Sequence, residues 1–299
     1  MTDYTVYLNG EFLPESEAHL SIWDRGFTLG DGVFDNARTF GHRLFHLDDH
    51  LARLYRSLRY VYIDPGLTPA QLGDIAERVL SSSINRVDRG DDVNLAFRIS
   101  RGTAAAGPTC LVTCRPIDFG RFARHYSAGV DLVTPTVRAI SRDIMDPRVK
   151  TQSRIVNVLA ELQADAARPG AWPLLCTSRG IITDSSRASF LMVQNGCVMT
   201  PKGGRVLAGV TAAVTTQLAE SLGYRVEERD LTPYDALLAD EALLASTSLV
   251  VLPVRSINGS LIGSHEVPGP VTGRLIEAWK RLTGVDFVSQ ALSFADRIV

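Results

Sequence analysis

The order of strand-like and helix-like segments constrains the fold of this 299-residue chain most. Asn9-Gly10 and Asn195-Gly196 each separate two short apolar runs, a spacing typical of two-residue β-hairpin turns. Several strand-like runs follow one another with no helix between them, so the strict βαβ alternation of a doubly wound parallel sheet is missing. The sequence therefore predicts an α+β or mixed α/β fold.

Helices are predicted where apolar residues recur every three or four positions. Residues 44–58 show leucines at this spacing, and residues 68–80 form a second candidate, with Thr68 as N-cap and Pro69 at the first helical position. A third candidate at 153–167 places apolar side chains on one face: Ile155, Val158, Leu159, Leu162 and Ala166. Later helices are predicted at 211–222 and 270–282. Strands are predicted at 93–100, 109–115, 174–177, 181–183, 189–194, 197–200 and 242–253.

The periodicity breaks around residues 118–129, which follow Pro116 and contain two glycines. We interpret this segment as a linker between a smaller domain of residues 1–117 and a larger domain of residues 130–299. A chain of this length suits one large or two ordinary domains.

Composition excludes several classes of function. The formal net charge is −2 and the chain has no basic run, so a nucleic-acid partner is not expected. No stretch approaches the roughly 18 apolar residues of a membrane span, and the first ten residues do not resemble a signal segment. The four cysteines and few histidines show no metal-ligand spacing, so no metal site is expected and buried thiols in a reducing cytoplasm are predicted.

Lysine is scarce, since only Lys150, Lys202 and Lys280 stand among 31 basic residues. Arginine stays charged at working pH, whereas a lysine amine can form a Schiff base with an aldehyde. Lys150 lies in the middle of the chain, directly before a predicted helix. A lone lysine is most often simply solvated, so its interpretation depends on the motifs around it.

Four other motifs are weak when each is taken alone. The run VLAGVT (206–211) leads into a helix whose free N–H groups suit either an anion or a threonine cap. Asp184 ends a short apolar strand, where it either caps a turn or holds a ligand. The hydroxyls of residues 246–248 interrupt an apolar run and need partners, either one another or an anion. The glycine-dense stretch 24–34 indicates that the backbone passes close to another group.

In this order and spacing the motifs resemble the class IV (fold type IV) pyridoxal-phosphate aminotransferases. That family includes branched-chain aminotransferases, D-amino acid transaminases, R-selective amine transaminases and aminodeoxychorismate lyase. The segments that carry the resemblance are DRGFTLGDGVF (24–34), HLARLYRS (50–57), VK (149–150), TDSSRASFLMV (183–193), VLAGVT (206–211), residues 228–254 and PGPVT (268–272). The resemblance covers nearly the whole chain. It implies a homodimer active in amino acid metabolism, with pyridoxal 5′-phosphate at the interface of two domains and bound mainly by the larger one.

The resemblance also implies roles for individual residues. Lys150 takes the position of the Schiff-base lysine, and Asp184 that of the carboxylate that keeps the pyridine nitrogen protonated. The positions that surround the cofactor phosphate are Arg53, Val210, Thr211, Ser246 and Thr247. The positions that line the substrate are Phe34, Arg38, Arg98 and Ser248, with Arg98 as the candidate for the substrate carboxylate.

The chain departs from the family pattern at several of these positions. Asp184 stands where the family has a glutamate, and it is one methylene shorter. Arg187 lies in a stretch that is usually small and polar, where a cation is expected to compete for Asp184. Ala96 stands where branched-chain enzymes usually have a tyrosine, and the loop 103–107 lacks the arginine expected of a D-amino acid transaminase.

The predicted reaction moves an amino group between an amino acid or amine and a 2-oxo acid, with Lys150 as both Schiff-base residue and general base. Two alternatives stay open at this point. One is a β-eliminating lyase on the same cofactor, and the other is a catalytically weak homologue that binds the cofactor.

Overall fold

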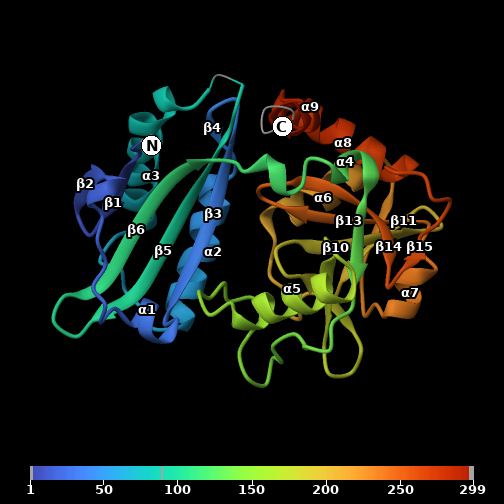
Figure 1. Cartoon of the computed structure of the whole chain (residues 1–299), viewed down its shortest axis with the longest axis horizontal. Helices are drawn as coiled ribbons and strands as arrows, with labels where there is room; N and C mark the ends of the chain where they lie inside the picture. Colours follow the sequence, from blue (N-terminus) through green and yellow to red (C-terminus); the bar gives the residue numbers. More distant parts are fainter. Residues whose placement is uncertain (1–2, 89, 296–299) are drawn as a thin grey trace. The chain divides into compact units, whose positions relative to one another are not determined.

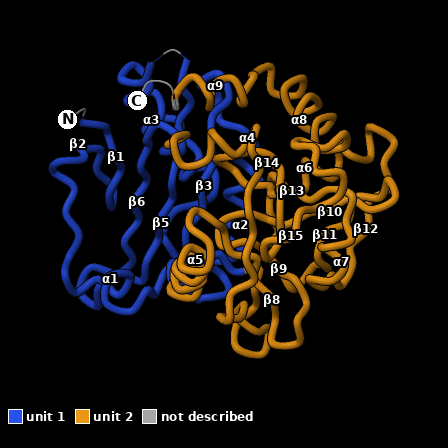
Figure 2. Tube along the Cα trace, turned by 45° about the vertical axis from the view of Figure 1, so that its right-hand side comes forward, with its two compact units in different colours: residues 1–117, 149–154 blue, residues 118–148, 155–299 orange. Residues whose placement is uncertain are grey.

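The chain divides into two compact units in a computed structural model that describes residues 3–88 and 90–295. Unit 1 comprises residues 1–117 and 149–154, and unit 2 comprises residues 118–148 and 155–299 (Figure 2). Each unit combines a largely antiparallel or mixed sheet with helices, so the predicted mixed α/β fold class is confirmed.

Unit 1 contains a six-stranded antiparallel sheet in the order β2-β1-β6-β5-β3-β4 (Figure 1). The strands are β1 (Thr5–Leu8), β2 (Glu11–Pro14), β3 (Gly32–Phe40), β4 (Arg43–Leu44), β5 (Val93–Thr103) and β6 (Gly107–Pro116). The predicted hairpin turn is confirmed, because Asn9 and Gly10 both have positive φ, 49° and 105°, between β1 and β2. Strand β3 was not predicted, because its start lies in the glycine-dense stretch and polar residues interrupt its apolar positions.

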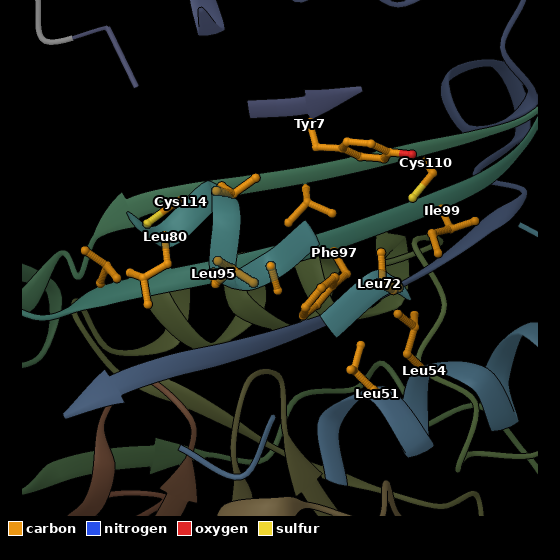
Figure 3. Close-up of a cluster of buried hydrophobic side chains, with 14 of the residues drawn as sticks. Tyr7, Leu51, Leu54, Leu72, Leu80, Leu95, Phe97, Ile99, Cys110 and Cys114 are labelled. Atoms are coloured by element: carbon orange, nitrogen blue, oxygen red, sulfur yellow. The ribbon is translucent and has the colours of Figure 1, made fainter. Parts of the chain in front are cut away.

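The hydrophobic core of unit 1 lies between one face of this sheet and helices α2 (Leu47–Tyr60) and α3 (Pro69–Ser83) (Figure 3). Both helices were predicted, and α3 begins with a complete capping box formed by Thr68 and Gln71. Leu54 of α2 and Leu72 of α3 pack with Phe97 of β5, and all three are fully buried. Burial of each such side chain contributes roughly 1.5–3 kcal/mol. The opposite face of the sheet carries none of these core side chains.

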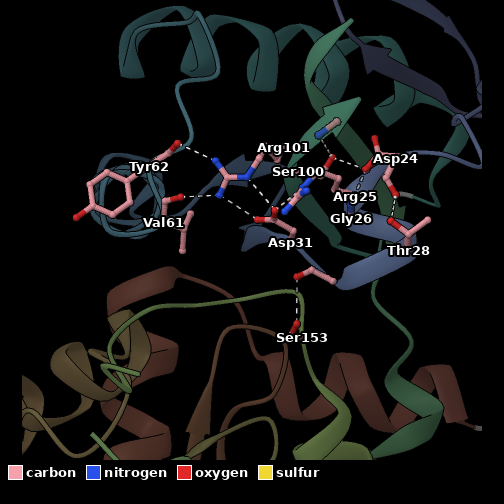
Figure 4. Close-up of polar contacts among 12 residues, drawn as sticks. Asp24, Arg25, Gly26, Thr28, Asp31, Val61, Tyr62, Ser100, Arg101 and Ser153 are labelled. Carbon is pink, nitrogen blue, oxygen red and sulfur yellow. Dashed lines mark hydrogen bonds and ion pairs between the residues drawn. The ribbon is translucent and has the colours of Figure 1, made fainter. Parts of the chain in front are cut away.

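A polar network holds the turn that precedes β3 (Figure 4). Asp24 caps helix α1 (Arg25–Leu29) by accepting from the Gly26 amide, and its carboxylate also accepts from Ser100 and Thr109 at 2.6 Å each. Asp31 accepts from Arg101, and the same arginine donates to the carbonyls of Val61 and Tyr62, directly after α2. The start of β3 is thereby fixed to the neighbouring strand β5.

Residues 149–154 belong to unit 1 although the sequence analysis assigned them to the second domain. Thr151 forms an antiparallel bridge with Val33, and Ser153 donates to the Gly30 carbonyl at 3.1 Å (Figure 4). A side chain at Gly30 or Gly32 would collide with this segment, since a Cβ at Gly32 would lie 2.9 Å from Oε1 of Gln152. The close approach predicted from the glycines is confirmed, and the group that approaches is the segment after Lys150.

Unit 2 contains a nine-stranded mixed sheet in the order β12-β11-β10-β13-β14-β7-β8-β9, with β15 paired to β14. Its strands are β7 (Val130–Val133), β8 (Trp172–Cys176), β9 (Ile182–Ser185), β10 (Ser189–Gln194), β11 (Cys197–Pro201), β12 (Arg225–Arg229), β13 (Glu241–Ser246), β14 (Val250–Ile257) and β15 (Ser260–Leu261). Its helices are α4 (His125–Ala128), α5 (Ile155–Ala167), α6 (Val210–Ser221), α7 (Pro233–Leu237), α8 (Pro270–Thr283) and α9 (Phe287–Ala295). Short 3-10 turns lie at Glu15–Glu17, Ile84–Arg86 and Phe119–Arg121.

Two sequence predictions for unit 2 were wrong in detail. The run 242–253, predicted as one strand, is the hairpin β13–β14, because the hydroxyl residues after Ser246 turn the chain. The segment 118–129, predicted as a linker, is part of unit 2 and buries Phe119, Phe122 and Tyr126. Its apolar side chains are spaced without helical or strand periodicity, which is why the sequence pattern did not reveal its burial.

Helix α5 begins at Ile155, two residues later than predicted. Its apolar stripe is exposed rather than buried, with Ile155 and Leu162 more than 60% exposed, and the residues that face inward are Ala160 and Ala164. Among the described residues, no helix combines the length and the apolar character needed to cross a membrane.

Candidate active site

Lys150 lies in an extended segment that runs along the edge of β3 in unit 1. Its carbonyl accepts from the Phe34 amide at 3.0 Å, and its own amide donates to Ser57 of α2 at 3.2 Å. The Nζ atom lies 4.6 Å from the centroid of the Phe34 ring. Hydrogen bonds from its carbonyl and its amide therefore hold the Lys150 backbone, and the half-buried amine lies beside an aromatic ring.

Arg53 lies on α2 and is held by a buried carboxylate. Its Nε and Nη2 atoms donate to the two oxygens of Asp35 at 2.8 and 2.7 Å, and Nδ1 of His50 lies 2.9 Å from the same carboxylate. Burial alone would raise the pKa of Asp35, but the hydrogen bonds and charge of Arg53 outweigh it and hold the pKa well below its usual range. Burial lowers the pKa of His50 in the same cluster. The Asp35 carboxylate therefore neutralises the charge of Arg53. A phosphate bound here would accept hydrogen bonds from Arg53 but would not meet a net positive charge.

The face of the unit 1 sheet opposite the core carries the predicted substrate residues. Strand alternation places Phe34, Asn36 and Arg38 of β3 on this face, and the antiparallel register sets Phe34 opposite Arg98 of β5. The Arg98 side chain is exposed, and it makes no ion pair or hydrogen bond with any residue in the described ranges. Arg98 thus presents an available guanidinium one strand away from the Phe34 ring.

Arg38, predicted to line the substrate, has a different environment. It is 2% exposed, its Nε donates to the Thr39 carbonyl at 2.9 Å, and its Nη2 lies 3.5 Å from the Asp92 carboxylate. Its guanidinium also lies over the Phe40 ring. Arg38 therefore forms a buried ion pair with Asp92. The sequence did not reveal this pair because the two residues are 54 positions apart.

Asp184 is the penultimate residue of β9 in unit 2. Its Oδ2 atom accepts from the Leu207 amide at 3.2 Å, which joins the end of β9 to the loop that precedes α6. The carboxylate and the helix start therefore lie together in unit 2, as the motif order implies.

Arg187 does not compete for Asp184 as the sequence analysis expected. Its Nε and Nη2 atoms donate to the Glu161 carboxylate of α5 at 2.7 and 2.8 Å. This bidentate pair raises the pKa of Arg187 and leaves its charge engaged. The sequence did not reveal the pair because Glu161 is 26 residues away.

The N-terminus of α6 offers backbone donors. Gly209 is the N-cap and makes no side-chain capping bond, and the amides of Val210, Thr211 and Ala212 donate to no residue that the structure describes. A Cβ at Gly209 would lie 2.9 Å from Oγ of Ser189, so only glycine leaves this approach open. The helix start therefore has the chemistry of an anion site, namely three aligned N–H groups and a favourable dipole.

Ser246 is the last residue of β13, and Thr247 and Ser248 begin the turn of the β13–β14 hairpin. The turn closes at Val250, whose φ of 59° is rare for a β-branched residue and costs of order 1–3 kcal/mol. The buried Tyr126 hydroxyl donates to the Leu249 carbonyl at 2.6 Å and supports this backbone. The hydroxyl groups are thus held on a strained but buttressed turn.

Sequence reasoning missed several residues around these positions. Asp35 and His50 hold Arg53, Tyr126 holds the hydroxyl turn, and Asn36 and Asn94 share the sheet face with Arg98. Only the alternation along β3 could have shown Asn36, and that strand was not predicted.

A family profile described as amino-transferase class IV matches residues 32–257, more than half of the chain. The chain belongs to the class IV aminotransferases. The matched span includes every candidate cofactor and substrate residue named from the sequence, from Phe34 to Ser248.

Named relatives agree with this assignment. A Methanocaldococcus jannaschii protein, provisionally named a branched-chain-amino-acid aminotransferase, is 31% identical over 92% of this chain and 95% of its own length. A D-alanine aminotransferase of Bacillus licheniformis is 30% identical over 89% of this chain and 93% of its own length. These relatives are transaminases, and none of those compared favours the lyase alternative.

Solved structures confirm the fold type. The branched-chain amino acid aminotransferase of Thermobaculum terrenum, in its form with pyridoxal phosphate, has a TM-score of 0.83 at 22% identity and covers 95% of both chains. The Escherichia coli branched-chain aminotransferase gives 0.86 at 20% identity and covers 94% of this chain and 95% of its own. At these identities the likeness establishes the fold, and the roles of individual residues stay predictions.

Proposed function

We propose that this class IV aminotransferase uses pyridoxal 5′-phosphate to move an amino group between an amino acid or amine and a 2-oxo acid. The observation that carries the proposal is Lys150, whose backbone is held by hydrogen bonds to Phe34 and Ser57 and whose amine lies beside the Phe34 ring.

The described residues fit the cofactor at each of its ends. The unpaired amides at the start of α6 suit a phosphate, and Thr211, Ser246 and Thr247 add hydroxyl groups nearby in unit 2. Arg53 would add a charge-assisted hydrogen bond while Asp35 holds its guanidinium in place. Asp184, which lies in the same unit as α6, would accept a hydrogen bond from the protonated ring nitrogen.

When bound, pyridoxal phosphate supplies an aldehyde that takes up the amino group and a ring that accepts electrons from the substrate. Lys150 Nζ would hold the aldehyde covalently and, once released by the substrate, accept the proton of the substrate's α-carbon. Asp184 would keep a proton on the ring nitrogen. Its shorter side chain is already anchored by the Leu207 amide, so it acts from a fixed position.

Arg98 would bind the substrate carboxylate, because it is an exposed cation without a partner among the described residues. Phe34 would shield the reacting amine from water on one side. Ser248 lies on the hydroxyl turn and would contact the substrate there. Arg38 is left out of this proposal because Asp92 already engages it.

Association into a homodimer would explain two exposed apolar surfaces. In unit 1, Trp23 and Phe27 are 74% and 77% exposed next to Ile22 and Leu29, and in unit 2 the stripe on α5 is exposed as well. Large apolar side chains exposed this close together in the sequence are typical of a protein interface. Light scattering after gel filtration should give twice the monomer mass, and replacing Trp23 and Phe27 with serine should lower it.

A cytoplasmic location would suit the four cysteines, all of which are buried and free. Mass spectrometry of the protein isolated under alkylating conditions should find four reduced thiols. A disulfide in freshly isolated protein would contradict this location.

The central test is covalent attachment of the cofactor. After incubation with pyridoxal phosphate and borohydride reduction, peptide mapping should place the pyridoxyl group on Lys150. A Lys150→Ala variant should lose both the label and turnover, while the exposed Lys202→Ala control should keep both. Labelling of Lys202 or Lys280 alone would sink the proposal.

A further inference from the structure

The sheet face that carries Arg98 also carries two asparagines. Asn36 of β3 lies opposite Ala96 of β5, and Asn94 lies two residues before Ala96 on the same face. Asn94 and Arg98 are thus the two diagonal neighbours of Asn36, each about 7–8 Å away between Cα atoms. Ala96, with only a methyl group, occupies the centre of this arrangement.

Both asparagines have a polar atom that lacks a partner. The Oδ1 atoms of Asn36 and Asn94 are buried and accept no hydrogen bond from any residue in the described part of the chain. Most buried side-chain oxygens in proteins accept a hydrogen bond. Two unpaired oxygens on one face therefore favour a ligand that donates hydrogen bonds. Arg98 beside them calls for an anion.

The position of Lys150 orients such a ligand. Its Nζ atom lies over Phe34, which is in register with Arg98, one row before Asn36 and Ala96. Two residues along a strand span about 7 Å. A substrate with its α-carbon near Lys150 and its carboxylate on Arg98 would place a short side chain over Ala96, between the two asparagine oxygens.

We propose that this face selects an amino donor whose side chain ends in a hydrogen-bond donor, a primary amide of the size of asparagine, over a branched aliphatic side chain. The inference rests on the proposed aminotransferase function and names its substrate class. The two N–H groups of a primary amide match the two acceptor oxygens. An isopropyl group of the same shape would leave both oxygens unpaired, and a carboxylate would place negative charge against them.

Asparagine and leucine test this directly, because their side chains have nearly the same shape and differ in polarity. In the donor half-reaction, followed by the loss of cofactor absorbance, kcat/KM for asparagine should exceed that for leucine by about 10- to 100-fold, in whichever enantiomer reacts. Aspartate should be the poorest of the three. Equal or faster reaction with leucine would overturn the inference and leave the aminotransferase function intact.

Binding without turnover gives an independent measurement. Succinamate and 4-methylvalerate are the same two molecules without the amino group, so neither reacts. Calorimetric titration of the holoenzyme should show tighter binding of succinamate by about 10-fold or more. Preference for 4-methylvalerate would overturn the inference. A protein that reacts with no donor of either enantiomer and binds neither acid would contradict the proposed function as well.

Matched variants assign the preference to this face. Asn36→Leu should reduce the asparagine-to-leucine ratio by about 10-fold or invert it, and should change the succinamate-to-4-methylvalerate ratio in parallel. The same substitution at the exposed Asn85 of unit 1 should leave both ratios unchanged. If Asn36→Leu does not fold, Asn94→Leu tests the second oxygen. An unchanged ratio in a folded variant would overturn the inference.

Discussion

Unit 1 fixes its candidate residues through side-chain charge and core packing, whereas unit 2 fixes its own through the backbone. In unit 1, Arg53 lies on a helix that packs on the core, and it donates two hydrogen bonds to the fully buried carboxylate of Asp35 on β3. In unit 2, the donors are amides at the start of α6 and hydroxyls on a hairpin turn. A single side chain can therefore be removed in unit 2 at small cost, but not in the Arg53 cluster of unit 1.

The difference has a physical reason. A buried charge must be balanced where it lies, so Asp35 and Arg53 depend on each other. An amide at a helix start is placed by many backbone bonds at once, and no single side chain carries it. The following predictions test this contrast, beginning with the largest effect.

The strongest test removes the charge that balances Arg53. Asp35→Asn should lower the free energy of unfolding of the apoprotein by about 3–5 kcal/mol in urea titration, because it leaves a buried cation uncompensated. The matched change in unit 2, Glu161→Gln, breaks a partly exposed pair and should cost at most about 1 kcal/mol. Equal losses in the two variants would break the contrast. Pyridoxal phosphate should restore more stability to Asp35→Asn than to the wild type, since its phosphate would compensate Arg53.

A second test concerns the only carboxylate proposed to act on the cofactor. Asp184→Asn should lower kcat by about 100-fold or more, because it removes the group that keeps the ring nitrogen protonated. Asp184→Glu should keep most of the activity, and the exposed Asp230→Asn should behave like the wild type. Since the anchor of Asp184 is a backbone amide, neither variant at this position should change the unfolding midpoint by more than a small amount. Full activity of Asp184→Asn would remove this residue from the mechanism.

A third test follows stability with pH. The folded pKa of His50 lies below its unfolded value of about 6.5, so the unfolded state binds the proton first and stability falls as the pH drops below about 6.5. The folded pKa of Asp35 is also lowered, so its contribution is present above about pH 4 and is lost as the pH falls further. Urea midpoints of the wild type should therefore decline in two steps. Burial also lowers the pKa of His125 in unit 2, which therefore contributes to the same upper step. His50→Gln should reduce the upper step, and an upper step of unchanged size would contradict the assignment.

The smallest expected effect is at the hydroxyl turn of unit 2. Tyr126→Phe removes the bond to the Leu249 carbonyl and should cost about 0.5–1.5 kcal/mol of stability. If the turn contacts the phosphate, Tyr126→Phe should also raise KM for the cofactor. Tyr224→Phe, which removes a more exposed hydroxyl, serves as the control. A loss of several kcal/mol from Tyr126→Phe would show that unit 2 also depends on single side chains.

Local sequence determined much of the fold. Helices α2, α3, α6 and α8 and strands β5, β6, β10 and β11 were predicted because each carries its own periodicity, cap or turn residues. The same local signals predicted the start of α6, and composition alone drew attention to Lys150. The motif order gave the family, which the profile match shows.

Only the tertiary structure decided which charges meet. Arg53 pairs with Asp35, Arg38 with Asp92 and Arg187 with Glu161, and each pair joins residues 18 to 54 positions apart. It also decided that residues 149–154 pack on β3 and that two asparagines share a face with Arg98. The physical reason is that periodicity reports which face of an element is buried, while the partner on that face is set by strand register and chain reversal. The sequence by itself therefore determined the elements and the family, and the fold determined the partners of each candidate residue.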